Sequence, residues 1–326
     1  MPVRVGILSV GHVHAPSYAR CCQNSSEAEL VGLWDKDPAL ASKFGRDFGC
    51  RAWDRRDALI DACDAVVIAG ENLDHAELIE AACARGKAIL CEKPLAATQE
   101  QMDRIETAVT ESGALLMTAF PCPFSPAFES AMAKVESGEI GRVLSVCATN
   151  CGKCPGGWFT EKGKSGGGAM IDHVVHVSDL LRRLLKEEPS SVRAVTGNNM
   201  YGEEWEDTAM LTIDYPSGVF ATLDSSWSRT KSYKTWGDVT LKIVGEKGVV
   251  EVDLFLQSVD WYSDKVGAHG QIGYGSDLDQ MVVDEFTRAV REKTEPKISM
   301  QDGLAAARLA LAGYESARTG QPVSVG

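Results

Sequence analysis

The first 120 residues alternate short apolar runs with helix-length segments, and this alternation constrains the fold more than any other feature of the chain. The apolar runs are almost continuous in hydrophobic character, as the strands of a buried parallel sheet are. They are Val3–Val10, Leu30–Trp34, Ala65–Ala69, Ala88–Cys91 and Leu115–Ala119. The helices predicted between them are Pro16–Cys22, Pro38–Phe48, Asp74–Arg85 and Thr98–Ser112. Repeated strand–helix units predict an α/β fold, a doubly wound parallel sheet with helices on both faces.

After Pro121 the pattern changes, and the rest of the chain predicts a second domain of the α+β class. Its predicted helices are Phe124–Ser137, Ala169–Leu185, Asp277–Glu292 and Asp302–Arg318. A strand is predicted at Val143–Thr149, and Val192–Trp261 is a run of β segments with turns at Tyr215–Gly218 and Gly245–Gly248. Strands joined by short turns form an antiparallel sheet. We therefore predict two domains, residues 1–120 and 121–326.

The charge of the chain excludes nucleic acid as its main partner. Lys and Arg total 33 against 46 Asp and Glu, a formal net charge of −13. A phosphate backbone is repelled by such a field, and no local stripe of basic residues offsets it. No apolar run approaches the roughly 18 residues of a membrane helix, so we expect no membrane partner either.

The ten cysteines are predicted to be free thiols in a reducing cytoplasm. A strand begins almost at once, at Val3, where a secretion signal would place a basic segment followed by a long apolar one. Cys151 and Cys154 form one close CxxC pair. A single pair with no second pair and no nearby histidines is a weak zinc signal, so no metal is predicted there.

The turn after the first strand is typical of a degenerate dinucleotide fingerprint. Aligned with G-x-G-x-x-G, its key positions hold Ser9, Gly11 and His14. Gly11 is kept where the backbone must approach a pyrophosphate, and Ser9 and His12 flank it as further cofactor contacts. His14 stands where a small side chain usually packs. The alternative is a simple strand–helix turn with surface histidines.

Asp35 predicts the type of cofactor. It ends the second strand, 24 residues after Gly11, where an acidic residue accepts hydrogen bonds from the adenosine ribose hydroxyls. A carboxylate there repels a 2′-phosphate, so NAD is favoured over NADP, although Lys36 beside it weakens the argument. Asp35 could instead be a loop acid or a helix cap, but Asp37 already supplies the cap.

Two further strand ends carry polar residues at the edge where nucleotide crevices form. Glu71, Asn72 and His75 follow the run Ala65–Ala69, and Glu92-Lys93-Pro94 follows Ala88–Cys91. We predict cofactor contacts from Glu71, Asn72, His75, Glu92 and Lys93. A lysine held over a cofactor can donate a proton or stabilise an alkoxide. The alternative is a solvated surface lysine.

The longest helix of the second domain carries an acid and two imidazoles. Asp172 and His176 are four residues apart on one face, and His173 lies near the edge of that face. An acid and an imidazole so placed suit general acid–base catalysis, with Asp172 fixing the substrate or orienting the base. A metal site and a purely structural polar cluster are the alternatives, and no Glu or further His supplies an obvious third metal ligand.

The order of these motifs resembles the Gfo/Idh/MocA family of oxidoreductases over essentially the whole chain. The resemblance extends to Trp158, Trp205–Thr208 and Ser316–Gly320. It implies a Rossmann domain and an open antiparallel-sheet domain, with the substrate between them over the nicotinamide. It also implies that Lys93, Asp172 and His176 are catalytic. We predict that Trp158 and His173 contact the substrate.

The implied reaction is the NAD(P)-dependent oxidation of a secondary hydroxyl of a sugar, cyclitol or related polyol. The family also commonly has a cis peptide bond at Lys93–Pro94. One departure is the segment Ala119–Phe124, which lacks the Asn and Arg of many members. An open sheet face is often buried against a second subunit, so we expect a homo-oligomer formed through that face.

Two other functions use the same fold. Some relatives oxidise a sugar transiently, eliminate the glycosidic group and return the hydride, which makes them NAD-dependent glycosidases or lyases with no net redox change. A non-catalytic binding or sensor protein is the other possibility. Lys93, Asp172 and His176 are all intact, which argues against a degenerate relative.

Overall fold

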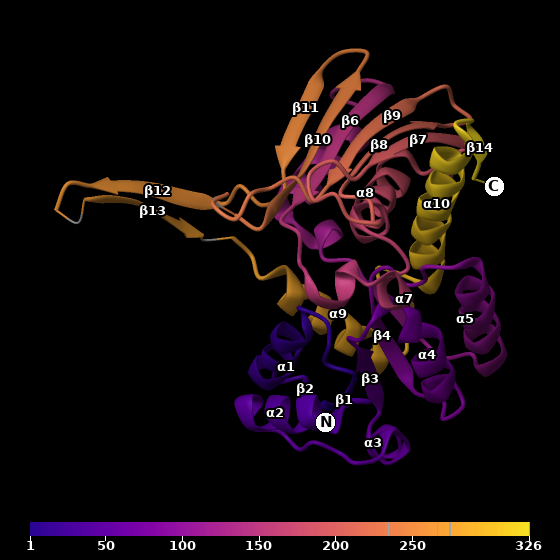
Figure 1. Ribbon diagram of the computed structural model, residues 1–326, viewed down its shortest axis with the longest axis vertical. Coiled ribbons are helices and arrows are strands. Elements are labelled where there is room, and N and C mark those ends of the chain that lie inside the picture. Colours follow the sequence, from indigo (N-terminus) through magenta and orange to yellow (C-terminus); the bar gives the residue numbers. More distant parts are fainter. Residues whose placement is uncertain (234, 266, 274, 326) are drawn as a thin grey trace.

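The computed structural model describes residues 1–233, 235–265, 267–273 and 275–325, and shows two domains, each built on its own sheet (Figure 1). The first is a five-stranded parallel sheet in the order β2-β1-β3-β4-β5. Its strands are β1 (Val3–Leu8), β2 (Ala28–Trp34), β3 (Ala65–Ile68), β4 (Ala88–Glu92) and β5 (Leu116–Ala119). The predicted doubly wound α/β sheet is confirmed, with its strands in the predicted places.

Helices cover both faces of this sheet, and local sequence signals set their ends. They are α1 (Ala15–Asn24), α2 (Pro38–Phe48), α3 (Arg56–Ala62), α4 (His75–Cys83) and α5 (Gln99–Ser112). Asp37 caps α2 by accepting from the backbone N–H of Ala39, and Thr98 caps α5 by accepting from Gln101. Helix α3 was not predicted, because seven residues with two buried apolar side chains are too few to show a helical period.

The second domain is a seven-stranded sheet in the order β11-β10-β6-β9-β8-β7-β14. Its strands are β6 (Val143–Gly152), β7 (Ser191–Gly197), β8 (Thr208–Asp214), β9 (Phe220–Ser226), β10 (Gly237–Gly245), β11 (Val249–Asp253) and β14 (Val323–Ser324). Neighbours are antiparallel except β6 and β9, which are parallel because a long connection through helix α8 (Ala169–Leu185) and strands β7 and β8 separates them. The mostly antiparallel sheet is thus confirmed, with one parallel pair.

One face of this sheet is covered and the other is open (Figure 1). Helix α8 and helix α10 (Met300–Thr319) pack on the covered face. Along β8, alternate residues are buried beneath the helices while Met210 and Thr212 point outward. The remaining short helices are α6 (Pro126–Glu136), α7 (Lys162–Ser165) and the 3-10 turns Asn72–Asp74, Cys122–Phe124 and Gly157–Thr160.

Two segments near the C-terminus depart from a simple two-domain division. Helix α9 (Leu278–Glu292) packs against α1, so the boundary at residue 120 separates the sheets but leaves one later helix on the first domain (Figure 1). Strands β12 (Ser258–Ser263) and β13 (Ala268–Gly273) form a hairpin that projects from the body of the protein.

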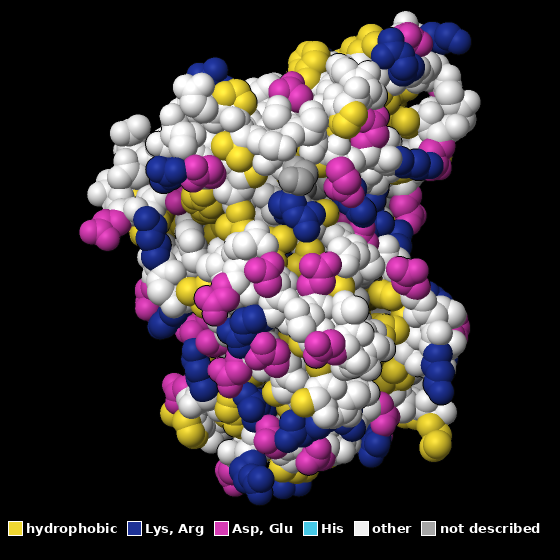
Figure 2. All heavy atoms as spheres, turned by 90° about the vertical axis from the view of Figure 1, so that its right-hand side faces the viewer, with side chains coloured by type: hydrophobic (Ala, Val, Ile, Leu, Met, Phe, Trp, Pro, Cys, Tyr) yellow, Lys and Arg dark blue, Asp and Glu magenta, His cyan; other side chains and the backbone are white. Residues whose placement is uncertain are grey.

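On the face shown in Figure 2, acidic and basic side chains are interspersed over the lower half, which is the domain of the first sheet. Within the described ranges, no helix combines the length and the apolar character that crossing a membrane requires.

Candidate functional site

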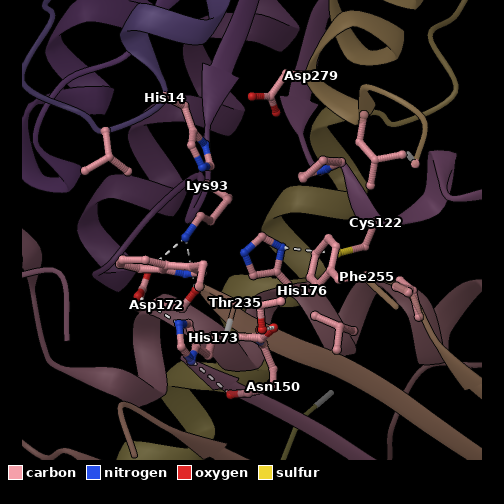
Figure 3. A pocket seen from close by; sticks show the side chains of 18 of the residues that line it. His14, Lys93, Cys122, Asn150, Asp172, His173, His176, Thr235, Phe255 and Asp279 are labelled. Atoms are coloured by element: carbon pink, nitrogen blue, oxygen red, sulfur yellow. Dashed lines mark hydrogen bonds and ion pairs between the residues drawn. The ribbon is translucent and has the colours of Figure 1, made fainter. Parts of the chain in front are cut away.

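A cavity of about 760 Å³ lies where the carboxyl ends of the first sheet meet helix α8. Its lining includes Lys93 from the end of β4 and Asp172, His173 and His176 from α8 (Figure 3). Lys93 and Asp172 are therefore in direct contact across the domain boundary, although they are 79 positions apart in the sequence. The structure brings together the three residues predicted to be catalytic.

Lys93 is held in the cavity by an ion pair. Its Nζ donates to Asp172 Oδ1 at 2.6 Å, and the residue is only 5% exposed. The Lys93–Pro94 peptide bond is cis, as predicted. Because Lys93 is buried and paired with Asp172, it is not a solvated surface lysine.

Asp172 is fully engaged by neighbouring donors. In addition to Lys93, its Oδ2 accepts from Trp227 Nε1 at 3.0 Å and lies 3.2 Å from His173 Nε2. Burial by itself would raise the pKa of Asp172, but the charge of Lys93 and the contact with His173 hold this pKa well below its ordinary value. Asp172 is therefore ionised, and the group it orients is Lys93.

His176 lies one turn further along α8, and its imidazole is neutral. Its ring stands edge-on to Phe120, with centroids 5.9 Å apart, and its Nδ1 is 4.0 Å from Cys122 Sγ. Burial, and then the positive charge of Lys93, lower the pKa of His176 well below its ordinary value. A neutral imidazole beside a charged lysine can accept a proton from a substrate hydroxyl.

His173 supports Asp172 from the side away from Lys93. Its Nδ1 is 2.9 Å from the backbone carbonyl oxygen of Asn150, so both ring nitrogens have partners. Gly152 leaves room for the ring, because a Cβ there would lie 2.8 Å from His173 Cε1. The substrate contact predicted for His173 stays a prediction, since the ring lines the cavity but already serves the carboxylate.

The fingerprint loop is fixed by Asp35. Asp35 Oδ2 accepts from Ser9 Oγ at 2.9 Å and from the Val10 N–H at 2.8 Å, while Oδ1 accepts from the Asp37 N–H at 2.8 Å. Ser9 has a positive φ of 64°, the conformation that glycine usually supplies at this turn. Asp35 is thus no helix cap, and Oδ1 retains lone-pair capacity for a ribose hydroxyl.

Trp158 contacts the same loop from the second domain. Its Nε1 donates to the Gly11 carbonyl at 2.8 Å, and its ring stacks on Phe159 with centroids 3.9 Å apart. Phe159, rather than Trp158, lines the cavity. The substrate contact predicted for Trp158 remains a prediction, whereas its contact with the cofactor loop is observed.

Glu92 forms a buried cluster with two histidines and a tyrosine. Its Oε1 accepts from Tyr18 Oη at 2.5 Å and lies 2.8 Å from His14 Nδ1 and 3.5 Å from His12 Nδ1, while Oε2 accepts from the Lys93 N–H at 3.0 Å. Burial opposes ionisation of Glu92, but the two imidazoles hold its pKa well below the ordinary value. The cluster therefore anchors the backbone of Lys93.

His12, His14 and Glu92 each offer one atom that could coordinate a metal ion, and these three atoms lie within 4.8 Å of one another. Each of these atoms already has a hydrogen-bond partner. His12 Nδ1 accepts from the His14 backbone N–H at 3.2 Å, His14 Nδ1 lies 2.8 Å from Glu92 Oε1, and this oxygen also accepts from Tyr18. Burial lowers the pKa of His12 to about 3, so its ring is neutral. We assign no metal to the cluster.

The other predicted cofactor residues, Glu71, Asn72 and His75, are not among the residues that line the cavity. Asn72 Nδ2 donates to the Ser165 carbonyl at 2.8 Å, and His75 Nδ1 is 3.0 Å from the Pro94 carbonyl oxygen. Glu71 Oε2 accepts from Lys36 Nζ at 2.5 Å. Asn72 and His75 thus brace the loops around the site, and the cofactor contacts of all three residues stay predictions.

The two cysteines of the CxxC pair lie in different environments. Cys151 is buried, with its Sγ 3.9 Å from the Asp224 carbonyl oxygen, and burial raises its pKa to about 11. Cys154 packs against the aromatic cluster of Phe159, Trp205 and Trp227. Both are free thiols, as are the other eight cysteines.

The residues of the site fit a dinucleotide. A Cβ added to Gly11 would meet nothing closer than Trp158 Nε1 at 3.8 Å, so the backbone there is open to a phosphate. A Cβ at Gly70 would lie 2.8 Å from Ser9 Cβ, so this glycine lets the β3 end approach the loop. His12 Nε2 is buried without a partner among the described residues. Because Nδ1 of the neutral His12 ring accepts a hydrogen bond from the His14 backbone N–H, the ring proton is on Nε2, which can donate to a bound cofactor.

Several groups at the site were missed by sequence reasoning. Trp227, Cys122 and Asn150 were not predicted to be in the site. Cys122 lies in the segment Ala119–Phe124 and Asn150 precedes Cys151, but no local pattern gives any of the three a role. Tyr18 could have been found, because it lies four residues after His14 on one helix face, the spacing at which two side chains meet a common partner.

Family models match both domains. Residues 3–120 match the model described as oxidoreductase family, NAD-binding Rossmann fold, and residues 128–251 match the GFO/IDH/MocA C-terminal domain. An inositol 2-dehydrogenase of Rhizobium meliloti (strain 1021) is 30% identical, covering 100% of both chains. A 2,7-anhydro-N-acetylneuraminate hydratase of Escherichia coli (strain K12) is 27% identical over 77% of this chain and 68% of its own.

A solved structure resembles the whole protein. The crystal structure of a putative myo-inositol dehydrogenase from Sinorhizobium meliloti 1021 matches with a TM-score of 0.83 and 28% identity, covering 99% of this chain and 100% of that one. The sequence motifs, the fold and the contact between Lys93 and Asp172 all indicate the same family. The chain belongs to the Gfo/Idh/MocA family of oxidoreductases and is an NAD(P)-dependent dehydrogenase acting on CH–OH groups.

Proposed function

We propose that this dehydrogenase oxidises a secondary hydroxyl of a sugar, cyclitol or related polyol, with NAD as its cofactor. The observation that carries the proposal is the buried 2.6 Å ion pair between Lys93 and Asp172, on the cavity wall that also holds His176. When bound, the nicotinamide supplies the hydride acceptor. The inositol dehydrogenase relative supports a polyol as the substrate.

His176, Lys93 and Asp172 have different roles in the proposed reaction. His176, neutral because burial and Lys93 lower its pKa, accepts the proton of the reacting hydroxyl. The ammonium group of Lys93 stabilises the developing alkoxide, and Asp172 holds that group in place. Glu92 fixes the Lys93 backbone from behind.

The test is whether polyols reduce NAD in the presence of the purified protein. We expect NADH absorbance to appear with at least one member of a panel of inositols, aldoses, alditols and glycosides. Absence of NADH formation and of substrate loss across the whole panel would contradict the proposal.

A lyase that returns the hydride is the second candidate, and the hydratase relative is the observation that favours it. The two functions differ in their products. A lyase consumes an anhydro sugar or glycoside without accumulating NADH, whereas the dehydrogenase forms NADH in equal amount to the oxidised product. Chromatography of the sugar products alongside the NADH assay distinguishes them.

We expect NAD(H) to bind more tightly than NADP(H), and Asp35→Ala to narrow the difference. The Asp35 carboxylate repels a 2′-phosphate, and Lys36 beside it is occupied by Glu71 and Asp74 at 2.5 and 2.6 Å. Fluorescence titration of both cofactors measures the two dissociation constants. Glu29→Ala, on the same strand, is the control, and equal or tighter NADP binding by the wild type would refute the preference.

We also propose a homo-oligomer formed through the open face of the second sheet. That face exposes Val195, Met210 and Phe220 by 65, 56 and 48%, on three neighbouring strands. Light scattering after size exclusion should give at least a dimer, and Met210→Asp should shift it toward monomer. A wild-type monomer at micromolar concentration would refute this assembly.

A further inference from the structure

The wall of the cavity on the second-domain side is apolar. Asn150 of β6 and Val239 of β10 are register partners, and the Leu254 N–H donates to the Val239 carbonyl at 3.0 Å. Asn150, Val239 and Leu254 are therefore neighbours across the sheet, and all three line the cavity. Val239 and Leu254 are 1 and 2% exposed, so they form a closed floor.

Two large apolar side chains extend this floor toward the solvent. Trp236 and Phe255 line the same cavity and are 54 and 42% exposed, and Leu256, which follows Phe255 in the chain, is 57% exposed. Phe255 lies on the far side of His176 from Lys93 in Figure 3. Adjacent exposed apolar groups at a cavity mouth mark a surface that an apolar ligand covers.

The charged pair Lys93–Asp172 and His176 lie at the other end of the cavity, and Thr235, Gln257 and Ser276 add uncharged polar side chains to its lining. The turn after β5 contributes Pro121 and Cys122 to the lining, which offer no strong hydrogen bond to a sugar. On the apolar floor, Asn150 Oδ1 has no partner among the described residues, while its Nδ2 donates to the Asp238 carbonyl at 3.0 Å. The floor therefore provides one carbonyl acceptor among apolar side chains.

Given the dehydrogenase function proposed above, we propose that the substrate is a hydroxylated ring carrying an apolar substituent, such as an aryl or alkyl glycoside. The reacting hydroxyl lies at Lys93 and His176, and the substituent lies against the apolar wall, which comprises Trp236, Val239, Leu254 and Phe255. A free polyol would leave hydroxyl groups unpaired against this wall, which is unfavourable.

The probes are methyl and phenyl β-glycosides of glucose, galactose, mannose and xylose, so that each pair differs only in the substituent. Calorimetry with the full-length protein and saturating NADH measures their dissociation constants. In at least one pair we expect the phenyl glycoside to bind about tenfold more tightly, because burying a phenyl ring removes a large apolar surface from water. Equal affinity within every pair, or binding of none, would overturn the proposal.

Phe255→Ser and Trp236→Ser should each reduce the phenyl-to-methyl preference to near one while leaving the dissociation constant of NADH unchanged. Met200→Ser, which alters another side chain that is 47% exposed, is the matched control and should keep the preference. A preference that survives both wall substitutions would also overturn the proposal.

This result is separable from the proposed function itself. If unsubstituted polyols reduce NAD but no phenyl preference is found, the dehydrogenase function holds and the apolar-substituent proposal fails. If phenyl glycosides bind as expected but neither they nor polyols are oxidised, the binding wall holds and the polyol dehydrogenase function fails.

Discussion

Lys93→Met is expected to lower kcat by about 10²–10⁴, the contribution typical of one positioned proton-transfer or charge-stabilising group. Methionine keeps most of the buried stem of Lys93 but removes the ammonium group that contacts Asp172 at 2.6 Å. The fingerprint loop is untouched, so affinity for NADH should largely survive. Steady-state kinetics on the active polyol and an NADH titration measure the two effects.

The control for this substitution is Lys134→Met, which removes a 52% exposed side chain paired with Glu139 and should leave kcat unchanged. Thermal unfolding of both variants shows whether loss of the buried charge also affects stability. Turnover close to wild type in Lys93→Met would mean that the reacting hydroxyl lies elsewhere, even though the fold is right.

A double substitution tests the role given to Asp172. Since Asp172 is proposed to act by holding Lys93, Asp172→Asn combined with Lys93→Met should cost little more in kcat than Lys93→Met by itself. Additive losses would instead show that Asp172 contacts the substrate independently of Lys93.

His176→Asn is the second substitution with a large expected effect, again a loss of about 10²–10⁴ in kcat through removal of the base. The reactive form is the neutral imidazole, whose pKa lies well below its ordinary value because burial and Lys93 disfavour the charged form. Wild-type kcat should therefore stay level as pH falls to about 6.5 and decline only below it. In His176→Asn this acid limb should be absent.

Lys93 supplies an internal check on this pH dependence. The charge of Lys93 is one cause of the low pKa of His176, so this pKa should rise in Lys93→Met. The residual activity of that variant should therefore begin to decline at a higher pH than the wild-type activity does. A wild-type decline centred above pH 6.5, or an acid limb that persists in His176→Asn, would contradict the assignment of His176 as the base. The measurement is kcat against pH for the three proteins.

The sequence by itself determined the local structure of the first domain and the place of its site. Continuous apolar runs fit only strands that are buried on both faces, and Asp37 and Thr98 fix where α2 and α5 begin. The motifs lie at strand ends, so Lys93 could be placed at the sheet edge without knowledge of the second domain. The i, i+4 spacing likewise placed Asp172 and His176 on one helix face.

Only the tertiary structure decided which partners these groups meet. Asp172 contacts Lys93 and His173, while His176 faces Phe120 and Cys122, because successive turns of α8 pack against different segments of the chain. Spacing along a helix gives the face but not what lies opposite it, since that depends on how the second sheet sets the helix against the first domain. The parallel pairing of β6 with β9 and the contact of Trp158 with Gly11 are long-range for the same reason. The periodicity of a sequence reports local structure, so it cannot predict a contact between distant segments that meet only in the folded chain.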